Sequence, residues 1–331
     1  SSLSSTQMGA LTTDQVTALT TAQAAALTST QSAGITTTQT AALESGDLNK
    51  LTTGAFAAID PSVTAKLSSS QVGALTSGQI TALTTAQAAA LTSTQSVGIT
   101  TSQTAALETA DLSAMTTSAF ATIATGVVAG LSSSQVGSLT NAQVTALTTT
   151  QAGALTATQA QGITTVQTSA LQNAALAKLT TAAFEALDTA VVAGLSNSQV
   201  GSLTSGQLGS LSSSQLAAVE TRDLVALTAE AIRAISTSGI EGLTTSQAMA
   251  LSSSQLAVLS SMQLGAFETQ DLAALTTSAI RGISSAGIRG LTTGQVVALT
   301  TLQSSVLSSA QLGALSSTQL SAFETRDVAV L

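Results

Sequence analysis

The octad LTNAQVTA, residues 139–146, is the stretch of sequence that decides the fold. Its first residue is large and apolar, and such a residue recurs at every eighth position from Leu3 to Leu331. A fixed short period over a whole chain is the signature of a repeat protein. We therefore expect no independent core, but one small unit whose stability comes from packing on its neighbours.

Two separate signals for the start of a helix coincide in this octad. Ser or Thr at the second position, followed three residues later by Gln, forms a capping box. Apolar residues at the first and sixth positions form a hydrophobic staple, so Leu139 and Val144 should pack across the cap made by Thr140 and Gln143. The pattern predicts one short capped helix in every octad.

The chain's only proline supports this register. Asp60 falls at the proposed N-cap and Pro61 at the first helical position, where proline is favoured because its missing N–H is not needed. Asp188 stands at the same cap position in a later octad. The octad is defined without reference to Asp or Pro, so their positions are independent support for the register.

Two other structures compete with a chain of short helices. One continuous helix fails, because eight residues at about 100° each leave the leucines on no common face. A β-solenoid is the serious alternative, but the first and sixth positions have opposite parity and would face opposite sides of a strand. The predicted fold is therefore an all-α repeat solenoid, a corkscrew-like superhelix of very short capped helices, with a β-solenoid as the alternative.

A slower repeat overlies the octads. Residues 11–74, 75–138 and 139–202 align as three copies of 64 residues, and Phe56, Phe120 and Phe184 mark the same site in each copy. Variant octads fill residues 203–331. We expect one continuous array over residues 1–331, without a linker, that forms a segment of a longer protein.

Composition excludes several classes of function. The chain has no His, Cys, Trp or Tyr, so thiolate and imidazole chemistry is impossible and no cofactor site is expected. Its net charge is −8 with 8 basic residues, which argues against a nucleic-acid partner. Polar residues interrupt every octad, so this segment contains no transmembrane stretch. We predict that the protein is not an enzyme and has no catalytic residues.

Five octads carry an acidic pair, with Glu at the second position and Asp at the fifth. Acidic groups near a helix N-terminus are favoured by the helix dipole, which is the simplest interpretation. Hard cations prefer oxygen ligands, so calcium is the alternative, although no metal site is otherwise indicated. Paired catalytic carboxylates are disfavoured because the pairs recur without other polar machinery. The calcium candidates are Glu44, Asp47, Glu108, Asp111, Glu220, Asp223, Glu268, Asp271, Glu324 and Asp327.

The run of Leu-Thr-Thr-x-Gln octads resembles very long, low-complexity surface or secreted proteins of Gram-negative bacteria, particularly β-proteobacteria. The resemblance covers residues 11–218 and, more loosely, 219–331. Some of those proteins look like subunits of thin extracellular nanofilaments in the biofilm matrix. The resemblance implies an extracellular or cell-surface location and a structural role.

Two functional hypotheses follow. The first is a structural subunit or segment of an extracellular filament or adhesin that supports biofilm matrix and cell attachment, with neighbouring repeats or copies of itself as partners. The second is a repeat module that binds ice, glycans or another surface through its regular Ser and Thr hydroxyls. An enzyme ranks last, because no residue pairs a nucleophile with a base.

Overall fold

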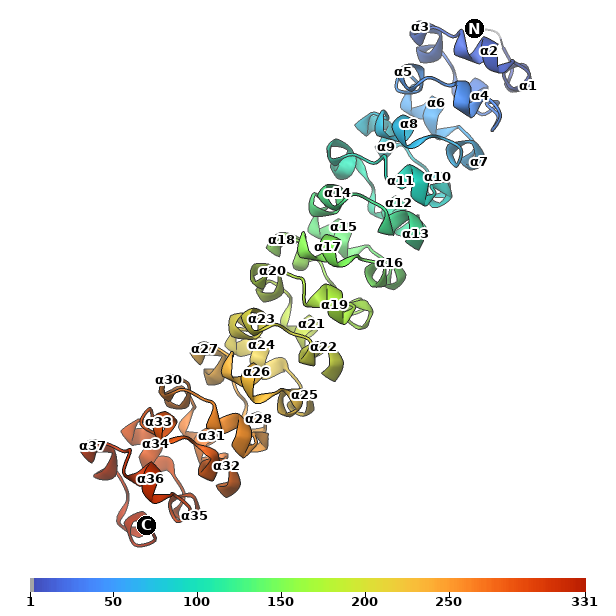
Figure 1. Cartoon of the computed structure of the whole chain (residues 1–331). Helices are drawn as coiled ribbons and strands as arrows, with labels where there is room; N and C mark the ends of the chain where they lie inside the picture. Colours follow the sequence, from blue (N-terminus) through green and yellow to red (C-terminus); the bar gives the residue numbers. More distant parts are fainter. Residues whose placement is uncertain (1–2) are drawn as a thin grey trace. The chain divides into compact units, whose positions relative to one another are not determined.

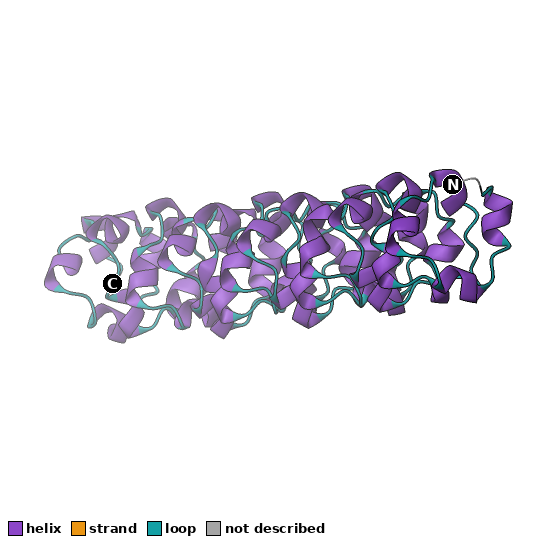
Figure 2. Cartoon of the chain, turned by 90° about the horizontal axis from the view of Figure 1, so that it is seen from above, coloured by secondary structure: helices purple, strands orange, loops and turns teal. Residues whose placement is uncertain are grey.

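A computed structural model describes residues 3–331, and within them the secondary structure is helical with no strand. Figure 2 shows the short helices joined by brief loops. The predicted all-α repeat solenoid is confirmed, and the β-solenoid alternative is wrong. In the described residues, no helix is long and apolar enough to cross a membrane.

Contacts between residues divide the chain into two compact units, Ser1–Leu171 and Gln172–Leu331, and both are built from the same octads. The helices of the first unit are α1 (Ser5–Gly9), α2 (Thr13–Thr17), α3 (Thr21–Ala25), α4 (Ser29–Ser32), η1 (Thr40–Ala42), α5 (Ser45–Leu48), α6 (Thr53–Ala57), α7 (Pro61–Thr64), α8 (Ser69–Gly73), α9 (Ser77–Thr81), α10 (Thr85–Ala90), α11 (Ser93–Ser96), η2 (Thr101–Ala106), α12 (Thr109–Ala114), α13 (Thr117–Ala121), α14 (Thr125–Ala129), α15 (Ser133–Gly137), α16 (Asn141–Thr145), α17 (Thr149–Gly153), α18 (Ala157–Ala160) and η3 (Thr168–Ala170).

The helices of the second unit are α19 (Asn173–Leu176), α20 (Thr181–Glu185), α21 (Thr189–Ala193), α22 (Asn197–Gly201), α23 (Ser205–Ser210), α24 (Ser213–Ala218), α25 (Thr221–Ala226), α26 (Ala229–Arg233), α27 (Thr237–Glu241), α28 (Thr245–Ala250), α29 (Ser253–Ala257), α30 (Ser261–Gly265), α31 (Thr269–Ala274), α32 (Thr277–Gly282), α33 (Ser285–Ile288), α34 (Thr293–Ala298), α35 (Thr301–Ser304), α36 (Ser309–Leu312), α37 (Ser317–Leu320) and α38 (Thr325–Val328).

The helices begin where the capping box places them. In α16, the Thr140 hydroxyl accepts a hydrogen bond from the backbone N–H of Gln143 at 3.2 Å, and the Gln143 amide oxygen accepts one from the Thr140 N–H at 2.9 Å. Asp60 caps α7 by accepting from the Ser62 N–H at 2.8 Å, and Pro61 opens that helix as predicted. Such short helices cannot nucleate alone, so the caps matter together with tertiary packing.

Within each unit, the chain winds so that helices three octads apart pack against each other, as α7 does on α10 and α29 on α32. Figure 1 shows these stacked coils in each unit. First- and sixth-position side chains fill the interior, and Phe56, Phe120 and Phe184 are fully buried. Contacts between coils join residues 25 to 31 positions apart, so one coil takes between three and four octads.

The 64-residue repeat has a structural counterpart in the first unit. The octads that begin at Ile35, Ile99 and Ile163 form the 3₁₀ helices η1, η2 and η3 instead of α-helices. Each has Thr at its sixth position, and the Thr40 hydroxyl donates to the Thr36 carbonyl at 3.4 Å. Thr64 makes the same bond to the Asp60 carbonyl within the α-helix α7, so this bond does not by itself select the 3₁₀ form.

A glycine directly precedes each of these three octads, where two coils meet backbone to backbone. A methyl group added to Gly98 would lie 2.0 Å from the Ser69 carbonyl oxygen, and Gly34 and Gly162 are equally tight against Ser5 and Ser133. Only a residue without Cβ fits at that distance. A glycine at the end of these octads thus allows adjacent coils to approach closely.

Candidate functional site

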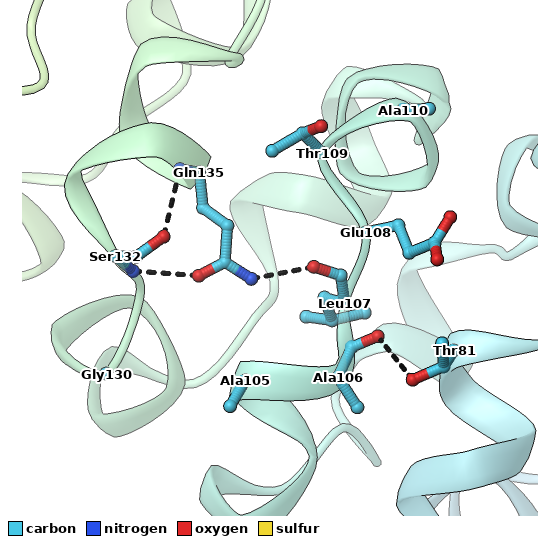
Figure 3. Close-up of a pocket in the computed structure, with 10 residues that line it drawn as sticks. All are labelled: Thr81, Ala105, Ala106, Leu107, Glu108, Thr109, Ala110, Gly130, Ser132 and Gln135. Carbon is cyan, nitrogen blue, oxygen red and sulfur yellow. Dashed lines mark hydrogen bonds between the residues drawn. The ribbon is translucent and has the colours of Figure 1, made fainter.

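Gln135 shows how one coil is joined to the coil before it. Its amide oxygen accepts a hydrogen bond from the Ser132 N–H at 2.8 Å, which completes the capping box. Its amide nitrogen donates to the carbonyls of Thr104 and Leu107 at 2.9 and 2.7 Å. Figure 3 shows the Gln135 side chain reaching from the cap at Ser132 to Leu107. One buried amide therefore caps its own helix and binds the preceding coil.

We call this arrangement a glutamine bridge, and the same pattern recurs in both units. In each case the fifth-position amide nitrogen donates to the carbonyl 28 residues earlier and to a second one 30 or 31 residues earlier. Residues that form this bridge include Gln39, Gln71, Gln79, Gln87, Gln95, Gln103, Gln135, Gln143, Gln151, Gln159, Gln167, Gln207, Gln215, Gln247, Gln255, Gln263, Gln295, Gln303, Gln311 and Gln319.

Sequence reasoning identified the capping role of these glutamines but missed the bridge. One signal was present: a capping box accepts Glu or Gln, yet the fifth position never holds Glu in this chain. A carboxylate can cap as well as an amide, but only the amide has N–H groups to donate. The use of Gln, and never Glu, at this position therefore indicates a donor role beyond the cap.

A shallow groove of about 550 Å³ lies beside the Gln135 bridge. Small residues and hydroxyls line it, and Glu108 is its one charged side chain (Figure 3). The Thr81 hydroxyl donates to the Ala106 carbonyl at 3.3 Å along its wall. This lining offers hydrogen bonds to a polar ligand, but it does not pair a nucleophile with a base.

In the five acidic octads, the glutamate and the aspartate occupy different environments. Each glutamate is the N-cap residue, and its side chain makes no capping bond. Each aspartate stands at the bridging position and is buried, with an exposed fraction between 0% and 4%. The structure thus brings Glu and Asp together only within each pair, in five separate octads.

The calcium candidates do not gather into larger clusters. Among residues 3–331, no group of three or more His, Cys, Asp or Glu side chains could hold a metal ion. Arg222 forms ion pairs with Glu220 at 2.6 Å and with Asp223 at 3.5 Å. Arg326 contacts Glu324 and Asp327 in the same way. Both arginines compete with a cation for the carboxylates, and calcium binding stays a prediction.

Burial changes the titration of the aspartates. Desolvation, assisted by the nearby Glu108 carboxylate, raises the pKa of Asp111 from 3.8 to about 6. The same two causes, burial and then Glu44, raise the pKa of Asp47. Burial also raises the pKa of Asp271, but a hydrogen bond from the Thr245 hydroxyl opposes the effect. A buried carboxyl without a cationic partner favours its neutral form.

Comparison with known proteins supports a repeat protein. Residues 40–85, 104–141, 216–253 and 264–301 match the model of the ALTTAQ repeat family, which together is slightly less than half of the chain. No curated protein and no solved structure matches the chain significantly. The matched family is a repeat family rather than a catalytic one, so nothing in these comparisons points to enzyme activity.

Proposed function

We propose that the chain is a structural segment of an extracellular bacterial filament or adhesin that supports biofilm matrix and cell attachment. The observation that supports this most directly is the glutamine bridge, which joins coil to coil by the same bonds in both units. Repetition of one stacking contact extends a solenoid without adding new interactions. Its partners are neighbouring repeats or further copies of the same chain.

The hydrogen bonds of the bridge suit a filament, which has to resist being pulled apart along its axis. Each bridge adds two or three buried hydrogen bonds to the apolar packing of a coil, and a typical buried bond contributes about 1 kcal/mol. The donor is always the glutamine amide, and the acceptors are backbone carbonyls that every residue carries. The contact therefore tolerates changes of side chain at exposed positions. A filament requires this combination of a fixed axial contact and a variable surface.

The proposal is tested in the cell that produces the protein. A strain that lacks the gene should lose thin extracellular filaments under the electron microscope and attach less to surfaces, and the gene returned in trans should restore both. Antibody labelling of intact cells, with and without external protease, checks the location. Filaments that persist in the deletion strain, or a chain that protease cannot reach, would contradict the proposal.

Exposed hydroxyl pairs favour a second candidate, a module that binds ice, glycans or another surface. The hydroxyls of Thr100 and Ser102 lie 2.9 Å apart, and those of Ser252 and Ser254 lie 3.0 Å apart, each pair on the surface. Neighbouring hydroxyls at a fixed spacing suit the recognition of sugars or ordered water. Thermal hysteresis and glycan-array binding of the purified chain test this, and null results in both would remove it.

A further inference from the structure

The glutamine bridge is interrupted at several places along the chain. In runs of three consecutive octads, the fifth position holds Asp, Ala, Val or Gly, and none of these side chains has an N–H group to donate. A coil takes between three and four octads, so each run removes the bridges from most of one coil. We call such a run a bridge-free coil. The bridge-free coils are residues 43–66, 107–130, 171–194, 219–242 and 267–290.

The bridge-free coils of the first unit are bridged on one side only. Residues 107–130 accept bridges from the following coil, in which Gln143 donates to two of their carbonyls. Toward the preceding coil, in the described part of the chain, they contribute one exposed hydrogen bond, from the Thr122 hydroxyl to the Ser93 carbonyl at 3.0 Å. Residues 43–66 donate no hydrogen bond to the described residues of their preceding coil. Each interruption therefore weakens a single interface between two coils.

The second unit contains the same kind of interruption. Among residues 3–331, no hydrogen bond joins residues 219–242 to the coil before them. Residues 267–290 keep one such bond, because the Thr245 hydroxyl donates to the Asp271 carboxylate at 2.6 Å. One hydroxyl contact stands there in place of the bridges that three glutamines would make. The weakened interface is therefore a feature of both units.

The aromatic side chains gather where the bridges are missing. Every Phe of the chain stands in an octad whose fifth residue is not Gln. Phe56, Phe120 and Phe184 occupy the middle octads of three bridge-free coils, and all three are fully buried. Apolar packing is non-directional, whereas a hydrogen bond weakens steeply with distance and angle. A bridge-free coil can therefore shift against its neighbour more easily than a bridged coil can.

The division of the chain into units agrees with these positions. In a stacked array, stability is the sum of the repeats and of the interfaces between neighbours, so opening begins at the weakest interface. The first compact unit ends at Leu171, which is the first residue of a bridge-free coil. The missing bridges thus coincide with a boundary that contacts between residues define independently.

We propose that the bridge-free coils are joints at which the solenoid opens, while the bridged coils between them stay closed. Tension or bending separates a bridge-free coil from the preceding coil first, because no glutamine amide holds the two together. The joints at residues 43–66 and 107–130 lie 64 residues apart, so the 64-residue repeat sets the spacing of the joints. The array then extends in steps and closes again when the tension is released. The joints would operate whether or not the chain builds a filament.

The test places one thiol in the full chain, which has no cysteine of its own, and measures its reaction with a thiol reagent in the absence of denaturant. Ala119 lies in a bridge-free coil and Ala152 in a bridged coil, and their exposed fractions are 0% and 1%. A buried thiol reacts only when its coil opens. The two buried hydrogen bonds of one bridge change an opening equilibrium by roughly 10- to 100-fold. The Ala119→Cys thiol should therefore react at least about 10-fold faster than the Ala152→Cys thiol.

An equal or slower reaction of the Ala119→Cys thiol would overturn the proposal, because it would mean that the packing of Phe120 replaces the bridges in full. A second experiment removes bridges from a bridged coil. Gln143, Gln151 and Gln159 are replaced together by Ala in the Ala152→Cys chain, which creates a new bridge-free coil. The reaction of the thiol should become at least about 10-fold faster.

The matched control removes the same caps without removing a bridge. Gln7, Gln15 and Gln23 make exposed cap bonds and have no preceding coil in this chain to bridge to. Replacing these three together by Ala, with an Ala24→Cys thiol as the reporter, should accelerate the reaction by less than about 3-fold, because only exposed bonds are lost. An acceleration at Ala152→Cys that is no larger than the acceleration at Ala24→Cys would overturn the proposal.

Discussion

At the scale of the residue, each bridging glutamine both caps its own helix and binds the preceding coil, because its amide carries an acceptor and a donor. The oxygen of each bridging glutamine is committed to its own helix cap, and the nitrogen to the coil before it. Replacing this amide by the carboxylate of glutamate keeps the oxygen that accepts the cap bond but removes the N–H groups that donate to the preceding coil. The shorter aspartates of the acidic octads form no capping box, so the exchange has to be made with glutamate, and Gln143 allows this.

Gln143→Glu should destabilise the coil at neutral pH by about 3 kcal/mol, because it keeps the cap but places a buried charge against the carbonyls of Leu112 and Met115. Gln15→Glu is the control, since Gln15 is exposed and makes the cap bond but has no preceding coil to bridge to. Urea unfolding followed by circular dichroism measures both. Equal shifts for the two variants would show that the bridge carries no stability.

Glycine at the coil crossing gives a second prediction for a single residue. Gly98→Ala should cost about 3 kcal/mol, because the new methyl group would lie 2.0 Å from the Ser69 carbonyl oxygen and force the two backbones apart. Gly46→Ala meets nothing within 4 Å and should instead stabilise helix α5 by about 0.5–1 kcal/mol. Thermal unfolding of the two variants should shift in opposite directions, and a shared direction would refute the close crossing.

At the scale of the element, each helix is too short to be stable unless its terminal backbone groups find hydrogen-bond partners. An α-helix leaves its first four N–H groups without internal partners, and a helix of four to six residues consists almost entirely of such ends. The cap therefore decides whether the turn forms at all. Most octads use Ser or Thr for this purpose, and the acidic octads rely on tertiary packing instead.

Thr140→Ala should lower the stability of α16 by about 1 kcal/mol, because the N–H of Gln143 loses its acceptor. Thr140→Ser keeps the hydroxyl and should change stability by less than about 0.5 kcal/mol. Hydrogen exchange of the Gln143 amide reports the loss directly. If exchange is unchanged in the alanine variant, the capping bond is not what holds this helix start.

At the scale of the whole molecule, deletions that preserve the register of the octads should leave the fold stable, and deletions that shift this register should destabilise it. Deleting residues 75–138 removes one 64-residue copy and places Gln143 where Gln79 was, opposite the carbonyls of Leu48 and Leu51. All bridges across the junction then have partners. We expect helicity per residue and the unfolding midpoint to stay close to those of the full chain.

A deletion of residues 79–138 is the matched control, because it removes only four residues fewer but leaves half an octad at the junction. Bridges on the two sides of the junction lose their partners, so a separate, earlier unfolding transition should appear in circular dichroism. Indistinguishable melting curves for the two deletions would mean that the bridges do not set the register of the coils.

The sequence by itself determined the short-range structure. The octad, the capping box and the N-cap at Asp60 all depend on neighbours within eight residues, and local chemistry was enough to predict them. The tertiary structure alone decided what lies 25 to 31 residues away: the number of octads in a coil, the second role of Gln, the need for Gly98 and the buried state of Asp111. These depend on the angle between successive helices, which accumulates over several octads and which no single octad encodes.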